Sequence, residues 1–428
     1  MVQKNLIIVI AVAAVIVVAG VAAFFLLNQG GGEKAPTYDT DFAGKPIEVA
    51  DNLDNGIVAV GQDTFRWVTY FGLANKCVMV DQNDMTNYLG KAFMYNGRAL
   101  VDIEGGNSAT LAADDPARAY FTHANCSITS DDVRVILELK PSMVVVPASF
   151  YTDVPNEMAA IEKAGIKTVA IGYIYTFLQK DTFEVTDDLK KQIGVLSQAL
   201  KQEKRGGELL DAFKYLTNDL KDLRSKITTT RTGYAGALAY NGAHGLDSSI
   251  AYHMPMALAG VDNILTGTVD YEGSGVKTYN AADIAQNMKN DTVLFIDASG
   301  YASNTTNESK GIAKLFQDHD AYIVIAYIWT GINLEDIFVQ AYQIMNYVYG
   351  DSVLSESQFA EKVNKVYDLF FGTHYTNRNI SVFKSYTVDL PASGTPIFED
   401  INNFYMVAKK NPIHGEVTIN SEGELSYN

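Results

Sequence analysis

The chain has 428 residues, more than one hydrophobic core usually supports, so we expect two domains. Hydrophobic residues make up 47% of it, a content that excludes an intrinsically disordered protein. The formal net charge is −17, from 50 acidic and 33 basic residues. Proteins that bind nucleic acid need clustered positive charge to displace counterions from the phosphates, so the composition argues against that class.

An uninterrupted apolar stretch, residues 6–27, lies close to the N-terminus. As a helix it would span the roughly 30 Å hydrocarbon core of a bilayer. Lys4 precedes it, so the positive-inside rule places residues 1–5 in the cytoplasm and the rest of the chain outside. The stretch is longer than the apolar region of a cleaved signal peptide and ends in bulky residues. We therefore favour a single-pass signal anchor, with cleavage as the alternative.

Residues 28–50, which begin NQGGGEKAP, have the composition of a flexible linker. Five Asn-X-Ser/Thr sequences further along agree with an extracytoplasmic location. The chain has two cysteines, Cys77 and Cys126, which could form a disulfide or remain separate thiols. Their number and spacing do not support a cysteine metal site.

Residues 51–185 alternate between strand and helix patterns and predict a first α/β lobe. Strands at 57–61 and 76–81 flank a helix within 62–74, a β-α-β unit that implies a parallel sheet. No element is assigned to residues 82–119, whose periodicity is weak. Helix, turn and strand then follow at 130–147 and again at 155–172, where Gly165 would end the helix.

Residues 186–227 predict a long helical spine, because their apolar side chains recur in steps of three and four. Thr186 is a suitable N-cap, and Asp187 and Asp188 suit the positive end of the helix dipole. Gly206 and Gly207 predict a break or bend near the middle. The spine would join the two lobes.

Residues 228–384 repeat the pattern and predict a second α/β lobe. We expect strands at 233–240 and 320–327, a short helix at 253–260, helix, turn and strand at 280–297, and helices at 334–350 and 357–372. The remaining segment, 385–428, departs from the pattern. It contains a predicted hairpin that turns at Asn420 to Gly423, which we interpret as an added edge or cap of the second lobe.

Several of these stretches resemble one known family. They are DDVRVILELKPSMVVVPASF with AAIEKAGIKTVAIG, then ALAGVDNI, then AYIWTGINLEDIFVQAYQIMNYVYGD. In this order they resemble the class III solute-binding proteins of ABC importers for iron–siderophores, haem and cobalamin, over roughly residues 55–372. The resemblance implies two Rossmann-like lobes joined by a rigid helix, with the ligand in the cleft between them. The family docks on its permease through a glutamate in each lobe, and the matching positions here are Arg134 and Met254.

Ligands of open α/β sheets bind beyond the carboxyl ends of the strands, and here those loops are rich in Tyr, His and Trp. Arg66 could clamp an anionic group or lie on the surface, and Trp329 could stack on a ligand or seal the second lobe. His123 and His244 could ligate iron or cobalt, bond a ligand, or be ordinary loop residues. The predicted ligand-binding residues are Gln62, Thr64, Phe65, Arg66, Tyr120, His123, Phe150, Tyr151, Tyr173, Tyr240, Asn241, His244, Tyr301, Tyr327 and Trp329.

The sequence contains no G-x-x-x-x-G-K-[ST], H-E-x-x-H or G-x-S-x-G motif, so we expect no catalysis and no resident cofactor or metal. We predict a monomeric, membrane-anchored, extracytoplasmic binding protein that passes an iron chelate or a cobalamin-like metal complex to an ABC permease and its ATPase. One alternative is a metal-binding enzyme or chelatase-like protein on the same two lobes. Another is a surface sensor or receptor without an importer.

Overall fold

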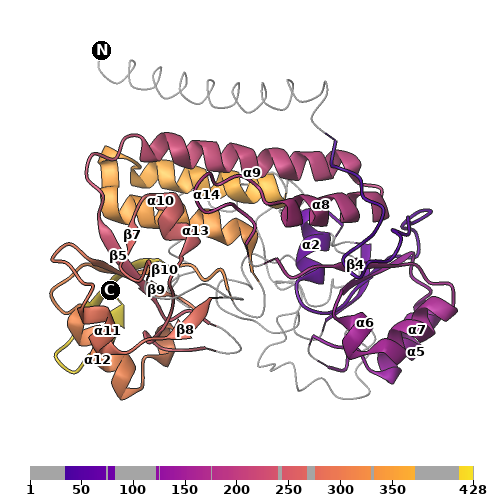
Figure 1. The fold of residues 1–428 in the computed structure, drawn as a ribbon, viewed down its shortest axis with the longest axis horizontal. Helices are drawn as coiled ribbons and strands as arrows, with labels where there is room; N and C mark the ends of the chain where they lie inside the picture. The colour runs from indigo at the N-terminus through magenta and orange to yellow at the C-terminus, as the bar shows by residue number, and fades with distance from the viewer. Residues whose placement is uncertain are drawn as a thin grey trace, which may run out of the picture.

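The computed structural model describes residues 34–73, 76–81, 122–124, 126–174, 176–239, 243–267, 275–328, 332–371 and 414–427. These residues form two α/β lobes, and helix α9 lies across both of them (Figure 1). No helix within these ranges is long and apolar enough to cross a membrane. The predicted anchor, residues 6–27, lies outside them, as does the unassigned segment 82–119.

The first lobe contains a parallel sheet, as the β-α-β pattern predicts. Its strands, in spatial order, are β2 (Cys77–Val80), β1 (Ile57–Ala59), β3 (Met143–Pro147) and β4 (Thr168–Ile171). They are almost wholly buried, because helices cover both faces of the sheet. Helices α2 (Thr64–Tyr70) and α8 (Asp187–Ala199) pack on one face, and α5 (Ser130–Leu139), α6 (Phe150–Asp153) and α7 (Pro155–Lys163) on the other.

The predicted spine is two helices, α8 and α9 (Glu203–Arg224). The break lies at Leu200 to Gln202, where Lys201 adopts a left-handed backbone with φ 54°, so the predicted break at Gly206 and Gly207 is wrong. Gly206 lies inside α9, and a Cβ atom there would be 1.9 Å from Ser197 Oγ of α8. The glycine therefore lets the two helices approach closely instead of interrupting one of them.

The second lobe contains a mixed sheet, whereas the repeated pattern predicts a parallel one. Its eight strands are β12 (Leu425–Tyr427), β11 (Gly415–Ile419), β10 (Ala321–Val324), β9 (Val293–Asp297), β5 (Thr232–Gly236), β6 (Ser248–Ile250) and β8 (Val276–Thr278), with β7 (Asp262–Asn263) beside β5. Strands β5, β7, β9 and β10 are parallel. The antiparallel β6 and β8 are three residues long, and neither carries an apolar run that marks it in the sequence.

Seven helices complete the second lobe. They are α10 (Met254–Ala259), α11 (Ala281–Ala285), η5 (Tyr301–Ser303), α12 (Asn307–Leu315), α13 (Leu334–Tyr349), η6 (Gly350–Ser352) and α14 (Glu356–Phe371) within the described ranges. The structure confirms the predicted C-terminal hairpin, in which β11 and β12 pair antiparallel around a turn where Gly423 has φ 78°. Strand β11 also pairs with β10, so the hairpin extends the sheet.

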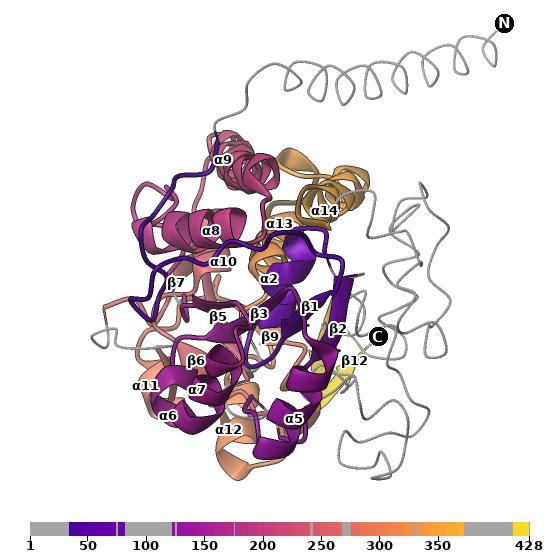
Figure 2. The same ribbon diagram turned by 90° about the vertical axis from the view of Figure 1, so that its right-hand side faces the viewer.

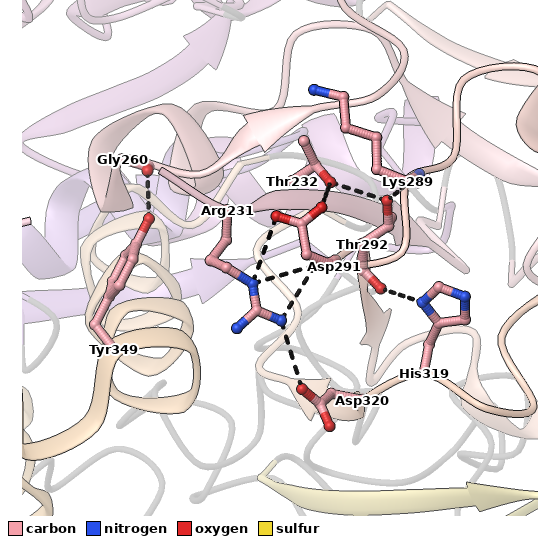
Figure 3. A network of polar contacts seen from close by, with 9 residues as sticks. All are labelled: Arg231, Thr232, Gly260, Lys289, Asp291, Thr292, His319, Asp320 and Tyr349. Atoms are coloured by element: carbon pink, nitrogen blue, oxygen red, sulfur yellow. Dashed lines mark hydrogen bonds and ion pairs between the residues drawn. The ribbon is translucent and has the colours of Figure 1, made fainter. Parts of the chain in front are cut away.

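The amino ends of β5, β9 and β10 are tied together on the side opposite their carboxyl ends (Figure 3). Arg231 bonds the carbonyl oxygen of Asp291, and its Nη2 lies 3.7 Å from Asp320 Oδ2. Thr232 Oγ1 lies 2.9 Å from Thr292 Oγ1, and the carbonyl oxygen of Thr292 is 2.9 Å from Nδ1 of His319. This network fixes the strand register and leaves the carboxyl ends for a ligand.

Residues 34–50, which we call the N-terminal arm, are folded onto the first lobe, so most of the predicted flexible linker is not a free chain. The arm covers the exposed edge of β4. Phe42 N donates to Ala170 O, Ala170 N donates to Asp41 Oδ2 at 2.9 Å, and Thr168 N donates to Glu48 Oε2 at 2.9 Å. These bonds satisfy backbone groups that an edge strand otherwise leaves unpaired, which explains why a polar segment is ordered there.

The two lobes share one hydrophobic core beneath α9. Phe213 of α9 contacts Phe338 of α13 and Phe370 of α14, with ring centroids 5.8 and 5.2 Å apart. Phe370 in turn contacts Tyr70 of α2 in the first lobe, at 5.2 Å. Arg205 of α9 donates to the carbonyl oxygen of Tyr70 and to those at the end of α14. A stiff connection between the lobes follows from this packing.

Candidate functional site

The loops at the carboxyl end of the first sheet are held by a buried carboxylate. Asp81 follows β2, and its two oxygens accept hydrogen bonds from Gly61 N and Cys126 N, each at 3.0 Å. Gly61 has φ 94°, and a Cβ atom there would be 2.4 Å from Pro147 Cδ of β3. These contacts hold together strand ends that are distant in the sequence. Cys126 and Cys77 do not form a disulfide.

His123 lies on this surface with a fixed ring orientation. Its Nδ1 is 2.5 Å from Asp132 Oδ1, and its backbone N donates to the same oxygen at 2.8 Å. Since an ionised carboxylate only accepts, Nδ1 donates to Asp132, and the neutral form of the ring would carry its lone pair on Nε2. Asp132 is fully buried, and it also forms a capping box with Thr129 at the start of α5. A carboxylate that orients an imidazole in this way is typical of metal-ligating histidines.

Other predicted residues of the first lobe divide by exposure. Tyr173, just beyond β4, is 37% exposed, and Gln62 is half-buried. Thr64, Phe65 and Phe150 are buried instead, because the turn after β1 and helix α6 direct them into the core.

Tyr151 points away from the predicted site. Its hydroxyl lies 2.8 Å from Thr168 Oγ1, which is at the amino end of β4, and Lys45 of the arm lies over its ring. Burial raises the pKa of Tyr151. We therefore do not retain it as a ligand-binding residue.

Arg66 belongs to a buried ion cluster between the lobes, not to a ligand clamp. Only 1% of its side chain is exposed, and its Nη2 bonds Glu335 at the start of α13 and lies 3.7 Å from Asp336 Oδ2. The hydroxyl of Tyr70 donates to Glu335, and Asn333 Nδ2 donates to Asp336 Oδ2 at 3.0 Å. Burial, and then the charge of Glu335, raise the pKa of Asp336 well above its ordinary value. One cation thus faces one carboxylate and one carboxylic acid.

A second buried acid ends β9 in the other lobe. Asp297 Oδ1 accepts hydrogen bonds from Ser299 N, at 2.9 Å, and from Ser299 Oγ. Asp297 Oδ2 and Gln340 Oε1 are both buried acceptors without a hydrogen bond among the described residues. The amide of Gln340 is fixed, because its Nε2 donates to Ile325 O. Burial raises the pKa of Asp297 to about 7, against the opposing effect of its hydrogen bonds from Ser299.

The predicted ligand-binding residues of the second lobe also differ in exposure. His244 is exposed, and its backbone oxygen lies against Gly300, which follows β9. Tyr301 is half-buried, and its hydroxyl interacts with the backbone of Tyr427 in β12. Tyr327 is 3% exposed, and its ring packs edge-on against His253 at 5.6 Å. Only His244 is therefore open to solvent among these three.

Four predicted residues, Tyr120, Tyr240, Asn241 and Trp329, lie outside the described residues. Within the described ranges, no group of three or more His, Cys, Asp or Glu side chains could hold a metal ion. Among the predicted residues that the structure describes, His123, Tyr173 and His244 are exposed at the strand ends.

The residue-by-residue prediction missed the acids that shape the site. Asp81 and Asp297 each follow an apolar run, VMV and LFI, at the carboxyl end of a strand. A charged residue directly after a buried strand was therefore an available signal. The sequence alone could not identify the hydrogen-bond partners of Asp132 and Glu335, because those contacts depend on the fold.

Comparison with solved structures supports this architecture. No protein-family model matches the sequence, and no curated protein matches it. MolA, the molybdate periplasmic binding protein of a Haemophilus influenzae ABC transporter, has a TM-score of 0.50 at 18% identity, over 78% of this chain and 97% of that one. A periplasmic solute binding protein from Veillonella parvula has a TM-score of 0.48 at 14% identity, over 82% and 98%.

A third similar structure is FepB from Veillonella parvula, a TroA-like periplasmic binding protein, with a TM-score of 0.42 at 14% identity. It covers 84% of this chain and 98% of that one. Identities this low establish the fold and leave ligands open. Over most of its length, the chain has the fold of the periplasmic binding protein MolA.

Proposed function

We propose that this chain is a non-enzymatic, extracytoplasmic solute-binding protein that holds a metal chelate between its lobes and delivers it to an ABC importer. The observation that carries the proposal is the two-sheet fold joined by α9, which matches the molybdate-bound MolA structure over 78% of this chain and 97% of that one. The apolar residues 6–27 would anchor it as a single-pass membrane protein.

The chemistry at the strand ends supports a chelate over a bare ion. His123 offers an oriented lone pair, and Tyr173 offers an exposed aromatic ring. Such groups suit a large, partly apolar ligand that has one open coordination position or hydrogen-bonding edge. Iron–siderophore complexes, haem and cobalamin are ligands of this kind. A small oxyanion such as molybdate, which MolA binds, would need a cage of hydrogen-bond donors.

The test is thermal unfolding of the full-length protein in detergent with ferric siderophores, haem, cobalamin or molybdate. At 100 times the dissociation constant, a true ligand adds about 2.7 kcal/mol to the free energy of unfolding. If none of these stabilises the protein, the proposal is wrong. If molybdate alone does, the binding function stands and the chelate class is wrong.

Two histidine variants locate the site. His123→Ala should weaken binding at least tenfold, because it removes the oriented Nε2. His319→Ala is the matched control, since His319 also bonds through Nδ1, but at the amino end of the second sheet. Equal affinity for both variants would remove His123 from the site.

A further inference from the structure

The N-terminal arm is fastened to the helices of the spine as well as to β4. Tyr38 N and O both bond the side chain of Gln198 in α8, at 2.7 and 3.1 Å, and Ala50 N donates to Ala199 O at 2.9 Å. Ala35 is 5% exposed and lies against Gly206 of α9. These hydrogen bonds, together with those to β4, keep the arm in place.

The first fastened residue, Ala35, lies on one outer side of the molecule. Figures 1 and 2 both show the arm starting beside α9, the outermost helix on that side. Helix α5 lies on the opposite side of the first lobe, because α8 and α5 pack on opposite faces of the sheet. Arg134, at the position of the family's docking glutamate, is 63% exposed on α5 and pairs with Glu138 at 3.1 Å.

Covalent geometry limits how far the arm can stand from a membrane anchor. Residues 28–34 connect the apolar stretch to Ala35, and seven residues span about 25 Å when fully extended. The layers from α9 through α8 and the sheet to α5 are about 40 Å thick, from helix diameters and layer spacings of about 10 Å. The connection is therefore too short to reach a bilayer that faces α5.

We propose that the full-length protein sits on its membrane with the α9 side of the spine turned towards the bilayer and with α5 turned away from it. The proposal rests on the membrane anchor of the proposed function. The partner of the α9 side is the lipid surface, and the fastened arm sets the orientation. An importer in the same membrane can then meet α5 only after the arm leaves β4 and α8, which adds sixteen residues, about 55 Å, to the connection.

The experiment measures how close each side lies to lipid headgroups. Both native cysteines are replaced by alanine, and a fluorophore is attached to Lys204→Cys on α9 or to Arg134→Cys on α5. Both positions are exposed, at 86% and 63%. Full-length protein is reconstituted in phosphatidylcholine nanodiscs with nitroxide-headgroup lipid. We expect at least threefold stronger quenching at position 204, and equal or reversed quenching would overturn the proposal.

A longer connection is the control. Thirty Gly/Ser residues inserted after Gly32 should abolish the difference, because the anchor could then reach past α5. A difference that persists would show that the short connection does not set the orientation, which also overturns the proposal. Failure of the full-length chain to float with liposomes would refute the anchor, and the orientation with it. Solute binding is measured independently, so its loss would leave the orientation result intact.

Discussion

Replacing Asp297 with asparagine should stabilise the protein by about 3 kcal/mol more at pH 8 than at pH 5. Asparagine can keep the interaction with the loop after β9, since its oxygen can accept from Ser299 N, and its amide carries no charge at either pH. The substitution therefore removes a titration and leaves the packing intact. The natural acid, in contrast, must lose its proton inside the protein as the pH rises.

The sign and size of this effect on the free energy of unfolding follow from the coupling between proton binding and folding. The pKa of Asp297 is about 7 in the folded protein and 3.8 as the model value, so the folded state binds the proton more tightly. Its stabilising contribution is complete below pH 3.8 and is lost as the pH rises to about 7. At about 1.4 kcal/mol per pH unit, the loss is about 4 kcal/mol in total and about 3 kcal/mol between pH 5 and pH 8.

The assay is urea unfolding of a fragment that starts at residue 28, at pH 5 and pH 8, followed by circular dichroism. The free energy of unfolding of Asp297→Asn, minus that of the natural chain, should be about 3 kcal/mol larger at pH 8 than at pH 5. Asp222→Asn, on the exposed side of α9, is the control and should gain nothing. If the free energies of unfolding of Asp297→Asn and the natural chain differ by the same amount at both pH values, the pKa of Asp297 is not raised and the reasoning is wrong.

Two further predictions concern buried contacts. Arg66→Met should cost about 3–5 kcal/mol in urea unfolding, because Glu335 would keep a buried charge without a cation, and the Arg66→Met/Glu335→Leu double variant should recover most of it. A single-variant loss under about 1 kcal/mol would contradict this. Gly206→Ala should lower the melting temperature by several degrees, because its Cβ would meet Ser197 Oγ at 1.9 Å. At Gly311 an added Cβ would lie 3.9 Å from the Cβ of Ala281, so Gly311→Ala should leave the melting temperature unchanged or raise it slightly in the same calorimetric scan.

Local signals in the sequence located many of the elements. Helix α5 begins at the Thr129 capping box and ends at Lys140, where φ is 49°, so its limits are encoded within a dozen residues. The C-terminal hairpin is marked in the same way by its turn. Strands β6 and β8 were missed because their order comes from partners across the sheet. The arm was missed for a similar reason, since its fixed partners, such as Ala170, are more than a hundred residues away.

The site was less predictable than the fold, because exposure depends on where each side chain points. Arg66 and Tyr173 both lie next to strand ends in the sequence. Helix α2 turns Arg66 towards Glu335, 269 residues later, whereas Tyr173 remains exposed. The rule that ligands bind at the carboxyl ends of strands selects loops but cannot choose among their side chains.

The buried acids explain how these loops could bind a solute without large rearrangement. Asp81 accepts a backbone N–H group with each of its oxygens and so holds two loops of the first lobe. Asp297 accepts from Ser299 and so holds the loop after β9 in the second lobe. Loops fixed before the solute arrives lose little entropy on binding, which raises affinity for a given set of contacts. With the lobes joined by a shared aromatic core, most of the binding energy would then come from His123, Tyr173, His244 and their neighbours instead of from domain closure.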